Sequence, residues 1–319
     1  MKIGFLTACL PQVPLEDLVA WASKQGFSML ELAAWPVDSS RDYQARQIDA
    51  ARFTSDDAKR VKEMFARYHM GISAMAYYDN NLDPDPQKRK ACHDHLKKVI
   101  DTASLLNVPL VGTFVGARAD KTPDECMKEI GTIFRPLVQY AADHGVRLMI
   151  ENCPMENWQR FGLPGNYAYS PELWEGLFNE VPSQDFGLNF DPSHLFWLGI
   201  DYIRAVKEFA SRIFHAHAKD TEILNDGAYC YGIFSRQLAP IPWKSGWWRY
   251  RIPGLGSIDW GRLTSVLQES GYDKVLSIEH EDPEWEGSET KVKRGLALGL
   301  KHLSRFVLGT QPLDSGTLL

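Results

Sequence analysis

Cysteine is scarce in this sequence, and its few copies are not arranged for chemistry. Five of the 319 residues are Cys, no two of them are separated by two residues, and the count is odd. A disulfide framework and a thiolate metal site both need regular, paired spacings, so neither of them is expected here.

Long apolar runs and an excess of positive charge are also missing. No window approaches about 18 uninterrupted apolar residues, so no membrane span is predicted. The N-terminal segment has one Lys and a short apolar run that soon reaches Pro11, which is typical of a buried first strand and not of a secretory signal. The formal net charge of −6 disfavours a broad nucleic-acid-binding surface. We expect a cytoplasmic protein that binds neither membranes nor nucleic acids.

The sequence does contain a regular alternation of short apolar segments and longer amphipathic segments. Strands are predicted at Lys2–Ala8, Met29–Trp35, Ile72–Tyr78, Leu110–Val115, Arg147–Cys153, Phe186–Asp191, Ile213–Ala218 and Lys274–Glu281. Helices are predicted at Pro14–Gln25, Ser55–Tyr68, Pro86–Leu106, Pro123–His144, Pro171–Asn179, Ile203–Ser211, Trp260–Ser270 and Ser288–Phe306. Start signals support several of these helices: Ser55 as an N-cap, and Pro86, Pro123 and Pro171 in or near a first turn.

Strict alternation of strands and helices predicts a parallel sheet, and eight such pairs in about 300 residues fit a closed barrel better than an open sheet. We therefore predict a single-domain (β/α)8 TIM barrel. It spans residues 1–310 and carries a long loop insertion at 221–254, and a C-terminal tail follows at 311–319.

Polar side chains gather at the ends of the last four predicted strands, where the active site of such a barrel lies. These strands end in LMIEN, GLNFDPSH, FHAHAKD and LSIEHED. A charge inside an apolar run is costly unless it is paired or bound to metal. One such carboxylate alone would as readily be a surface residue or half of an ion pair. Four neighbouring strands that deliver Glu, Asp, His and Glu at one level predict a site for one divalent metal ion.

Three carboxylates and one imidazole are mostly hard donors. They suit Mn²⁺, our first choice, or Mg²⁺, Co²⁺ or Fe²⁺ in an octahedral shell more than a closed structural zinc site, although Zn²⁺ is also compatible. Such an ion acts as a Lewis acid on a carbonyl, and two glutamates beside the substrate act as base and acid. This is the logic of an aldose–ketose isomerase or a ketose epimerase, in which proton abstraction beside a metal-bound carbonyl gives an enediolate.

The same segments, in this order, resemble the xylose-isomerase-like superfamily of sugar isomerases and epimerases. The resemblance covers nearly the whole chain and is strongest in IENCP, NFDPSHL, HAHAKD, PGLGSIDW and GYDKVLSIEHED. It implies that His194 contacts substrate oxygens, and it selects the second histidine of the H-x-H pair, so that His215 is a hydrogen-bonded core residue. Similarity to the ketose 3-epimerases implies a ligand set in which both glutamates also move the proton: Glu151, Asp191, His217 and Glu279.

Two features depart from the epimerase pattern. The Lys219–Asp220 pair is more similar to the dehydratase and uncharacterised isomerase branches. The insertion is aromatic, which favours a lid that stacks on a sugar or, equally, a dimer interface or packing on the barrel rim. Its aromatic residues are Tyr229, Tyr231, Phe234, Trp243, Trp247, Trp248 and Tyr250.

Three further residues are candidates for substrate binding. Lys219 would polarise a substrate oxygen, or else pair with a metal ligand. Arg251 would hold a substrate oxygen or phosphate, or else lie at the surface. Trp35 would form a pocket wall, or else belong to the core.

The predicted function is therefore a sugar isomerase or epimerase that acts on a small sugar, polyol or glycoside. A lyase of the same superfamily (an inosose-type dehydratase or a 3-keto-glycoside eliminase) is the runner-up, because it begins with the same proton abstraction. An endonuclease for DNA repair with the same fold is disfavoured, because such enzymes use a His-rich trinuclear zinc site. This chain has only nine His, and its second, third and fourth predicted strands end without an obvious His ligand. Retention of both glutamates disfavours a non-catalytic sugar-binding subunit. We expect a homo-oligomer (dimer or tetramer) or pairing with a small partner subunit.

Overall fold

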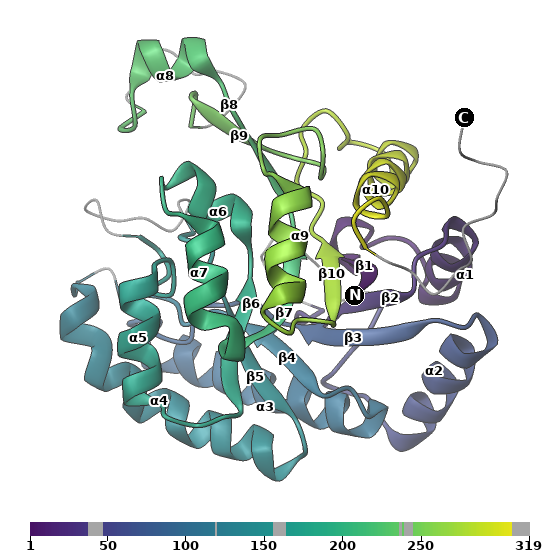
Figure 1. The fold of residues 1–319 in the computed structure, drawn as a ribbon. Coiled ribbons are helices and arrows are strands. Elements are labelled where there is room, and N and C mark those ends of the chain that lie inside the picture. Colours follow the sequence, from purple (N-terminus) through teal and green to yellow (C-terminus); the bar gives the residue numbers. More distant parts are fainter. Residues whose placement is uncertain (38–46, 119, 156–163, 236–237, 239–244, 308–319) are drawn as a thin grey trace, which may run out of the picture.

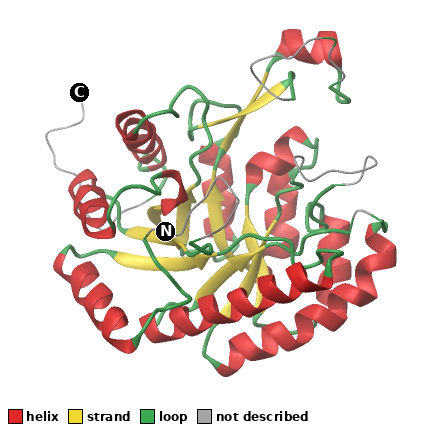
Figure 2. Cartoon of the chain, turned by 180° about the vertical axis from the view of Figure 1, so that it is seen from behind, coloured by secondary structure: helices red, strands yellow, loops and turns green. Residues whose placement is uncertain are grey.

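A closed barrel of parallel strands forms the centre of the molecule. The computed structural model describes residues 1–37, 47–118, 120–155, 164–235, 238 and 245–307. Eight strands close in the order β1–β10–β7–β6–β5–β4–β3–β2. Helices surround this barrel in the front view (Figure 1) and in the view from behind (Figure 2). The predicted (β/α)8 barrel is confirmed.

The elements follow the predicted alternation closely. The barrel strands are β1 (Lys2–Leu6), β2 (Met29–Ala33), β3 (Gly71–Ala76), β4 (Leu110–Thr113), β5 (Arg147–Glu151), β6 (Phe186–Phe190), β7 (Ile213–Ala218) and β10 (Val275–Ile278). The helices around them are α1 (Leu15–Gln25), α2 (Ser55–Arg67), α3 (Pro86–Leu106), α4 (Pro123–Asp143), α5 (Pro171–Glu180), α6 (Pro192–Trp197), α7 (Tyr202–Phe209), α9 (Trp260–Glu269) and α10 (Glu289–Leu303). Several strands end sooner than predicted, because the chain leaves the hydrogen-bonded ladder at the rim of the barrel.

Local chemistry sets the ends of the helices. Thr54 caps α2 in a reciprocal capping box with Asp57, so the predicted N-cap Ser55 is instead the first helical residue. α1 and α3 end at Gly26 and Asn107, both in the left-handed conformation that terminates helices. The predicted prolines do lie in first turns, at Pro86, Pro123 and Pro171.

The segment after β7 is not the plain loop that was predicted at 221–254. β8 (Asp220–Ile223) and β9 (Trp248–Arg251) pair in antiparallel fashion, and α8 (Asn225–Tyr231) follows β8. Figure 1 shows these three elements, hereafter the arm, projecting away from the barrel. The loop prediction is wrong here because β8 and β9 pair across an intervening segment, which a local pattern does not reveal.

The aromatic residues of the arm divide into two groups. Near the barrel, the Trp248 ring stacks on Trp197 of α6 with centroids 4.5 Å apart, and Tyr250 lies against His194. Near α8, the side chains of Tyr229 and Phe234 face solvent and are 91% and 85% exposed. The inner group packs on the barrel rim, as one of the two interpretations of the insertion requires.

Some predictions are not tested by the described residues. Trp243 and the tail at 311–319 lie outside the described residues. Within the described part of the chain, no helix is both long enough and apolar enough to cross a membrane. The oligomeric state and the cellular location stay predictions.

Candidate metal centre

The strands β5, β6, β7 and β10 are consecutive neighbours in the barrel, so their carboxyl ends meet at one part of its mouth. Glu151 ends β5, Asp191 follows β6, His217 lies near the end of β7, and Glu279 follows β10. One ligand atom from each of these four residues lies within 4.8 Å of those of the other three. The residues predicted from the strand ends therefore converge on one point.

Asp191 is held by its own turn, which leaves one oxygen for the site. Its Oδ1 accepts a hydrogen bond from the backbone N–H of Ser193 at 2.7 Å and so caps α6. The amide side chain of Asn152 binds both the N–H and the carbonyl of Asp191, at 2.7 and 2.9 Å. The second oxygen, Oδ2, is buried and receives no hydrogen bond, although His194 Nε2 lies 3.3 Å away.

His217 presents one ring nitrogen to the same point. Its Nε2 lies 3.0 Å from Oε2 of Glu31. Its Nδ1 faces the other candidate ligands, 3.0 Å from Oε2 of Glu279 and 4.0 Å from Oε1 of Glu151. The imidazole is therefore oriented with Nδ1 toward the point where the carboxylates meet.

His215 is a buried, hydrogen-bonded core residue, as the family resemblance implied. Its two ring nitrogens lie 3.0 Å from Oδ1 of Asn189 and 3.1 Å from the hydroxyl of Ser73. Burial lowers the pKa of His215 to about 4, so the ring is neutral. Both nitrogens are used inside the barrel.

This arrangement fits one divalent ion. A buried polar atom without a hydrogen bond costs about 1–3 kcal/mol, and such atoms are rare in folded proteins. Asp191 Oδ2 and His217 Nδ1 are buried without a well-aligned hydrogen bond; their charged neighbours are the Lys219 ammonium, 3.4 Å from Oδ2, and the Glu279 carboxylate, 3.0 Å from Nδ1. Bound cations are the usual partner for such a set of oxygen and imidazole donors.

The two glutamates of the site differ in their electrostatics. Burial, together with the charge of Glu279, raises the pKa of Glu151 to about 8. Burial also opposes ionisation of Glu279, but Lys219 and His217 outweigh it and hold the pKa of Glu279 well below its usual range. Without a bound ion, the pKa values of the two glutamates are thus driven apart, upward for Glu151 and downward for Glu279.

Lys219 places a positive charge inside this cluster. The residue is 1% exposed, and its ammonium lies 2.7 Å from Glu279, 3.0 Å from Glu281 and 3.4 Å from Asp191. Burial opposes the charge, but these carboxylates raise the pKa of Lys219 well above its usual range. Of its two predicted roles, pairing with a metal ligand is present in the structure, and contact with substrate stays a prediction.

His194 links the site to the arm. Its Nε2 lies 3.0 Å from Oε1 of Glu151, and its Nδ1 lies 2.8 Å from the hydroxyl of Tyr250. Burial and the charge of Lys219 lower the pKa of His194 to about 4, so the ring is neutral and one nitrogen donates while the other accepts. The predicted substrate-binding residue therefore lies beside a candidate catalytic glutamate.

Arg251 and Trp35, predicted to bind substrate, have other partners. The Arg251 guanidinium donates to Asp282 at 2.9 Å and also to Glu222, so it ties the arm to the loop after β10. Trp35 is buried, and its indole N–H donates to the carbonyl of Tyr78 at 3.3 Å. The core alternative thus fits Trp35, and substrate contact by either residue stays a prediction.

Asp220 connects the Lys219–Asp220 pair to the PGLGSIDW segment through hydrogen bonds. Its carboxylate accepts hydrogen bonds at 2.9 Å each from the backbone of Gly254, the backbone of Ile258 and the indole of Trp260. A Cβ at Gly256 would lie 2.3 Å from Oδ1 of Asp220, so only glycine fits there. The two motifs form one structural unit at the base of the arm.

One further acidic residue near the site, Glu31, was not predicted. Glu31 is fully buried and faces His217. Its signal is the same one that identified Glu151 and Glu279, a carboxylate inside an apolar run, here MLELAAW. Glu31 lies in the middle of β2, so a search of strand ends does not find it.

Comparisons with known proteins agree with this architecture. The family model of xylose isomerase-like TIM barrels matches residues 19–303. The uncharacterised protein YfiH of Bacillus subtilis is 27% identical over 297 residues, which are 88% of this chain and 93% of that protein.

Two solved structures show the same fold. A zinc-bound structure of the IolI protein has a TM-score of 0.69 at 21% identity and covers 96% of this chain and 99% of its own. D-psicose 3-epimerase of Clostridium cellulolyticum H10, solved with D-tagatose, has a TM-score of 0.66 at 15% identity, with coverage of 96% and 99%. The chain therefore belongs to the xylose isomerase-like TIM-barrel family.

Proposed function

We propose that this protein is a divalent-metal-dependent sugar isomerase or epimerase. The observation that carries the proposal is the pair Glu151 and Glu279, whose ligand atoms lie within 4.8 Å of each other and whose pKa values are displaced in opposite directions. Carboxyl groups driven apart in this way are suited to serve as acid and base in one reaction. The substrate we propose is a small sugar, polyol or glycoside with a carbonyl group.

Four side chains would hold the ion: Glu151, Asp191, His217 and Glu279. When bound, the ion would supply Lewis acidity toward the carbonyl of the substrate. Mn²⁺ remains our first choice because three of the four donors are carboxylates. Zn²⁺ is the second choice, since the related IolI structure contains zinc.

The remaining chemistry falls to the side chains of this chain. Glu279, held ionised by Lys219, is suited to accept the proton from the carbon beside the carbonyl, and Glu151 is suited to return one. In the reverse direction the two exchange these roles. His194, beside Glu151, would contact a substrate oxygen, and the nearby charge of Lys219 would stabilise negative charge that develops on the substrate.

A screen of ketoses, aldoses and polyols, with Mn²⁺ and with EDTA, tests the proposal. Glu151→Gln and Glu279→Gln are each expected to lose about 10²- to 10⁴-fold in kcat, because each removes a group that moves a proton. Glu281→Gln is the matched control, since Glu281 contacts Lys219 but is not one of the four ligands. If both Glu151→Gln and Glu279→Gln kept full activity, the proposed mechanism would be wrong.

A lyase that begins with the same proton abstraction is the second candidate. The observation that favours it is the arm, which brings the aromatic rings of Tyr250 and Trp248 to the site and so suits a substrate with a bulky leaving group. NMR of the reaction in D₂O separates the two. Epimerisation or isomerisation incorporates deuterium and keeps every substituent, whereas elimination releases water or an aglycone.

A further inference from the structure

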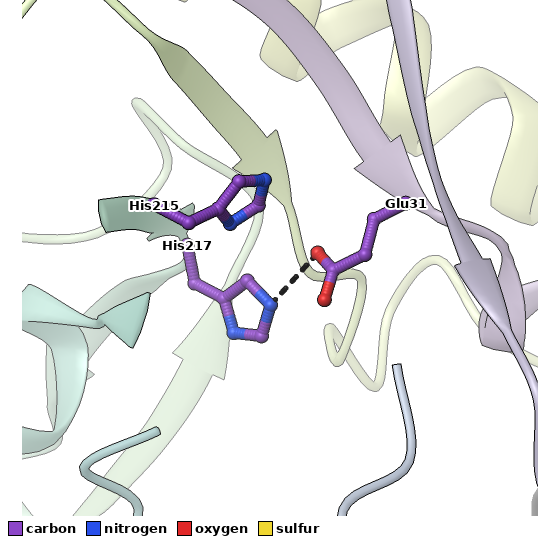
Figure 3. Close-up of side chains that lie close together, drawn as sticks. All are labelled: Glu31, His215 and His217. Atoms are coloured by element: carbon purple, nitrogen blue, oxygen red, sulfur yellow. Dashed lines mark hydrogen bonds and ion pairs between the residues drawn. The ribbon is translucent and has the colours of Figure 1, made fainter. Parts of the chain in front are cut away.

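Glu31 is a buried carboxylate on β2, next to the candidate metal centre. Its Oε1 accepts a hydrogen bond from the Tyr78 hydroxyl at 2.8 Å. Its Oε2 accepts one from the Ser277 hydroxyl at 2.7 Å and lies 3.0 Å from Nε2 of His217. Figure 3 shows the carboxylate pointing at the His217 ring. The three donors come from β10, from β7 and from the segment that follows β3.

An ionised carboxylate in this place requires donors on every side. Removing such a group from water costs several kcal/mol unless it is paired and hydrogen-bonded. Each of the two oxygens of Glu31 accepts a hydrogen bond from a hydroxyl group, which is the pattern of an ionised carboxylate. Glu31 is therefore an acceptor, so the hydrogen between it and His217 belongs to Nε2.

Asn189 is compatible with the same assignment. Its side chain lies between the two histidines, with Oδ1 3.0 Å from Nδ1 of His215 and Nδ2 2.6 Å from the Tyr78 hydroxyl and 2.9 Å from Nε2 of His217. The amide can donate to Tyr78, and the carboxylate of Glu31 accepts the imidazole N–H. Nε2 therefore faces Glu31, and Nδ1 is the nitrogen that faces the ligand cluster.

We propose that Glu31 is the positioning residue of the metal centre: it holds His217 in the tautomer and ring orientation that present Nδ1 to the ion. The inference rests on the proposed function, because it takes the metal site as given. A carboxylate that accepts from the second nitrogen of a metal-binding histidine fixes the ring and makes the ligand nitrogen more basic. The charge of Glu31 thereby acts on the ion without touching it.

The barrel makes room for this carboxylate and its supports. Tyr78 reaches Glu31 past Gly112 of β4, where a Cβ would lie 2.3 Å from the Tyr78 hydroxyl. Ser277 approaches from β10, in register with His217 of β7. Each of these small or polar residues replaces an apolar side chain that the barrel interior would otherwise hold.

The same group of residues does not form a second ion site. Ligand atoms of Glu31, His215 and His217 lie within 4.8 Å of one another. However, both ring nitrogens of His215 are hydrogen-bonded, to Asn189 and Ser73, and Nε2 of His217 faces Glu31. In these two rings only Nδ1 of His217 is left for a metal, and it points at the first cluster.

The test uses the full chain loaded with Zn²⁺, which is diamagnetic and permits NMR of ¹⁵N-labelled histidines. In the wild type, His217 is expected to show a ligated Nδ1 and a protonated Nε2, with its signals assigned from a His217→Gln sample. Glu31→Gln keeps the volume but removes the charge. Its Kd for Zn²⁺ and for Mn²⁺, measured by calorimetry, is expected to be about 10- to 100-fold larger than that of the wild type.

Tyr78→Phe is the matched control, because it removes one hydroxyl from Glu31 and leaves the carboxylate facing His217. Its Kd is expected to rise less than that of Glu31→Gln. A merely structural role for Glu31 predicts a lower melting temperature of the metal-free chain with an unchanged Kd and tautomer, and that result would overturn the inference. A wild type with protonated Nδ1 and ligated Nε2 would overturn it as well. If the wild type bound neither ion, the metal site of the proposed function would itself be refuted, before any variant is compared.

Discussion

Replacing Lys219 with Met is expected to make the stability of this protein depend on a divalent ion. The ammonium of Lys219 is buried and lies within 3.4 Å of three carboxylates, those of Glu279, Glu281 and Asp191. Removing one partner of a buried ion pair costs about 3–5 kcal/mol, because the remaining charge stays in a poorly solvated place. Met keeps most of the side-chain volume, so the loss in the free energy of unfolding reflects charge.

A bound ion would replace the lost positive charge. Ion at about 1,000 times its Kd adds about 4 kcal/mol to the free energy of unfolding of either protein, so the difference between them narrows only where the variant binds the ion more tightly. The ion is also expected to bind Lys219→Met more tightly than the wild type, because no ammonium competes for Glu279 and Asp191. The stability difference between the two proteins should therefore be large in EDTA and small in saturating Mn²⁺.

Urea unfolding of both proteins at neutral pH, in EDTA and in Mn²⁺, measures this difference. Lys90→Met is the control, because Lys90 forms an exposed pair with Asp94 and should cost less than about 1 kcal/mol under either condition. Two results would refute the reasoning. One is a Lys219→Met variant as stable as the wild type in EDTA, and the other is an equal loss with and without the ion.

Three further predictions concern the surroundings of the site. Gly112→Ala should cost about 1–3 kcal/mol and weaken ion binding, because the new Cβ would displace Tyr78; calorimetry checks both effects. Asp220→Asn should lower the free energy of unfolding by about 1–3 kcal/mol and leave the Kd for the ion unchanged, as measured by urea unfolding and titration. In EDTA, the folded chain holds the Glu151 proton more tightly than the unfolded chain, so stability should fall as pH rises from 4.5, the ordinary pKa, to about 8. Glu151→Gln should remove this part of the slope, and parallel curves for the two proteins would contradict the assignment.

The barrel was predictable because its signals are local. Each strand is a short apolar run, and helices begin and end at residues such as Pro86 and Gly26, whose backbone preferences act on neighbouring residues alone. The arm was not predictable in the same way. The pairing of Asp220 with Arg251 joins strands separated by a long segment, and neither strand has a pattern of its own that requires the other.

The convergence of the four candidate ligands was predictable from strand ends, but the contacts of nearby residues were not. A sequence places Glu151 and Glu279 at the same level of a barrel once the strands are known. The sequence does not show that Arg251 pairs with Glu222 and Asp282, because those contacts depend on the folded position of the arm. Glu31 was not predicted as part of the site, because its partners are distant in the sequence and it lies in the middle of β2.

The hydrogen bonds of Glu31 have a consequence for folding. Its contacts with His217 and Ser277 join residues separated by 186 and 246 positions in the chain. Such contacts form only when distant parts of the chain have met, because the entropy of the intervening segment must be lost first. The four candidate ligands come from the ends of β5, β6, β7 and β10, whereas Glu31 lies on β2 and reaches His217 only in the closed barrel. Full affinity for the ion would therefore report the completion of the fold.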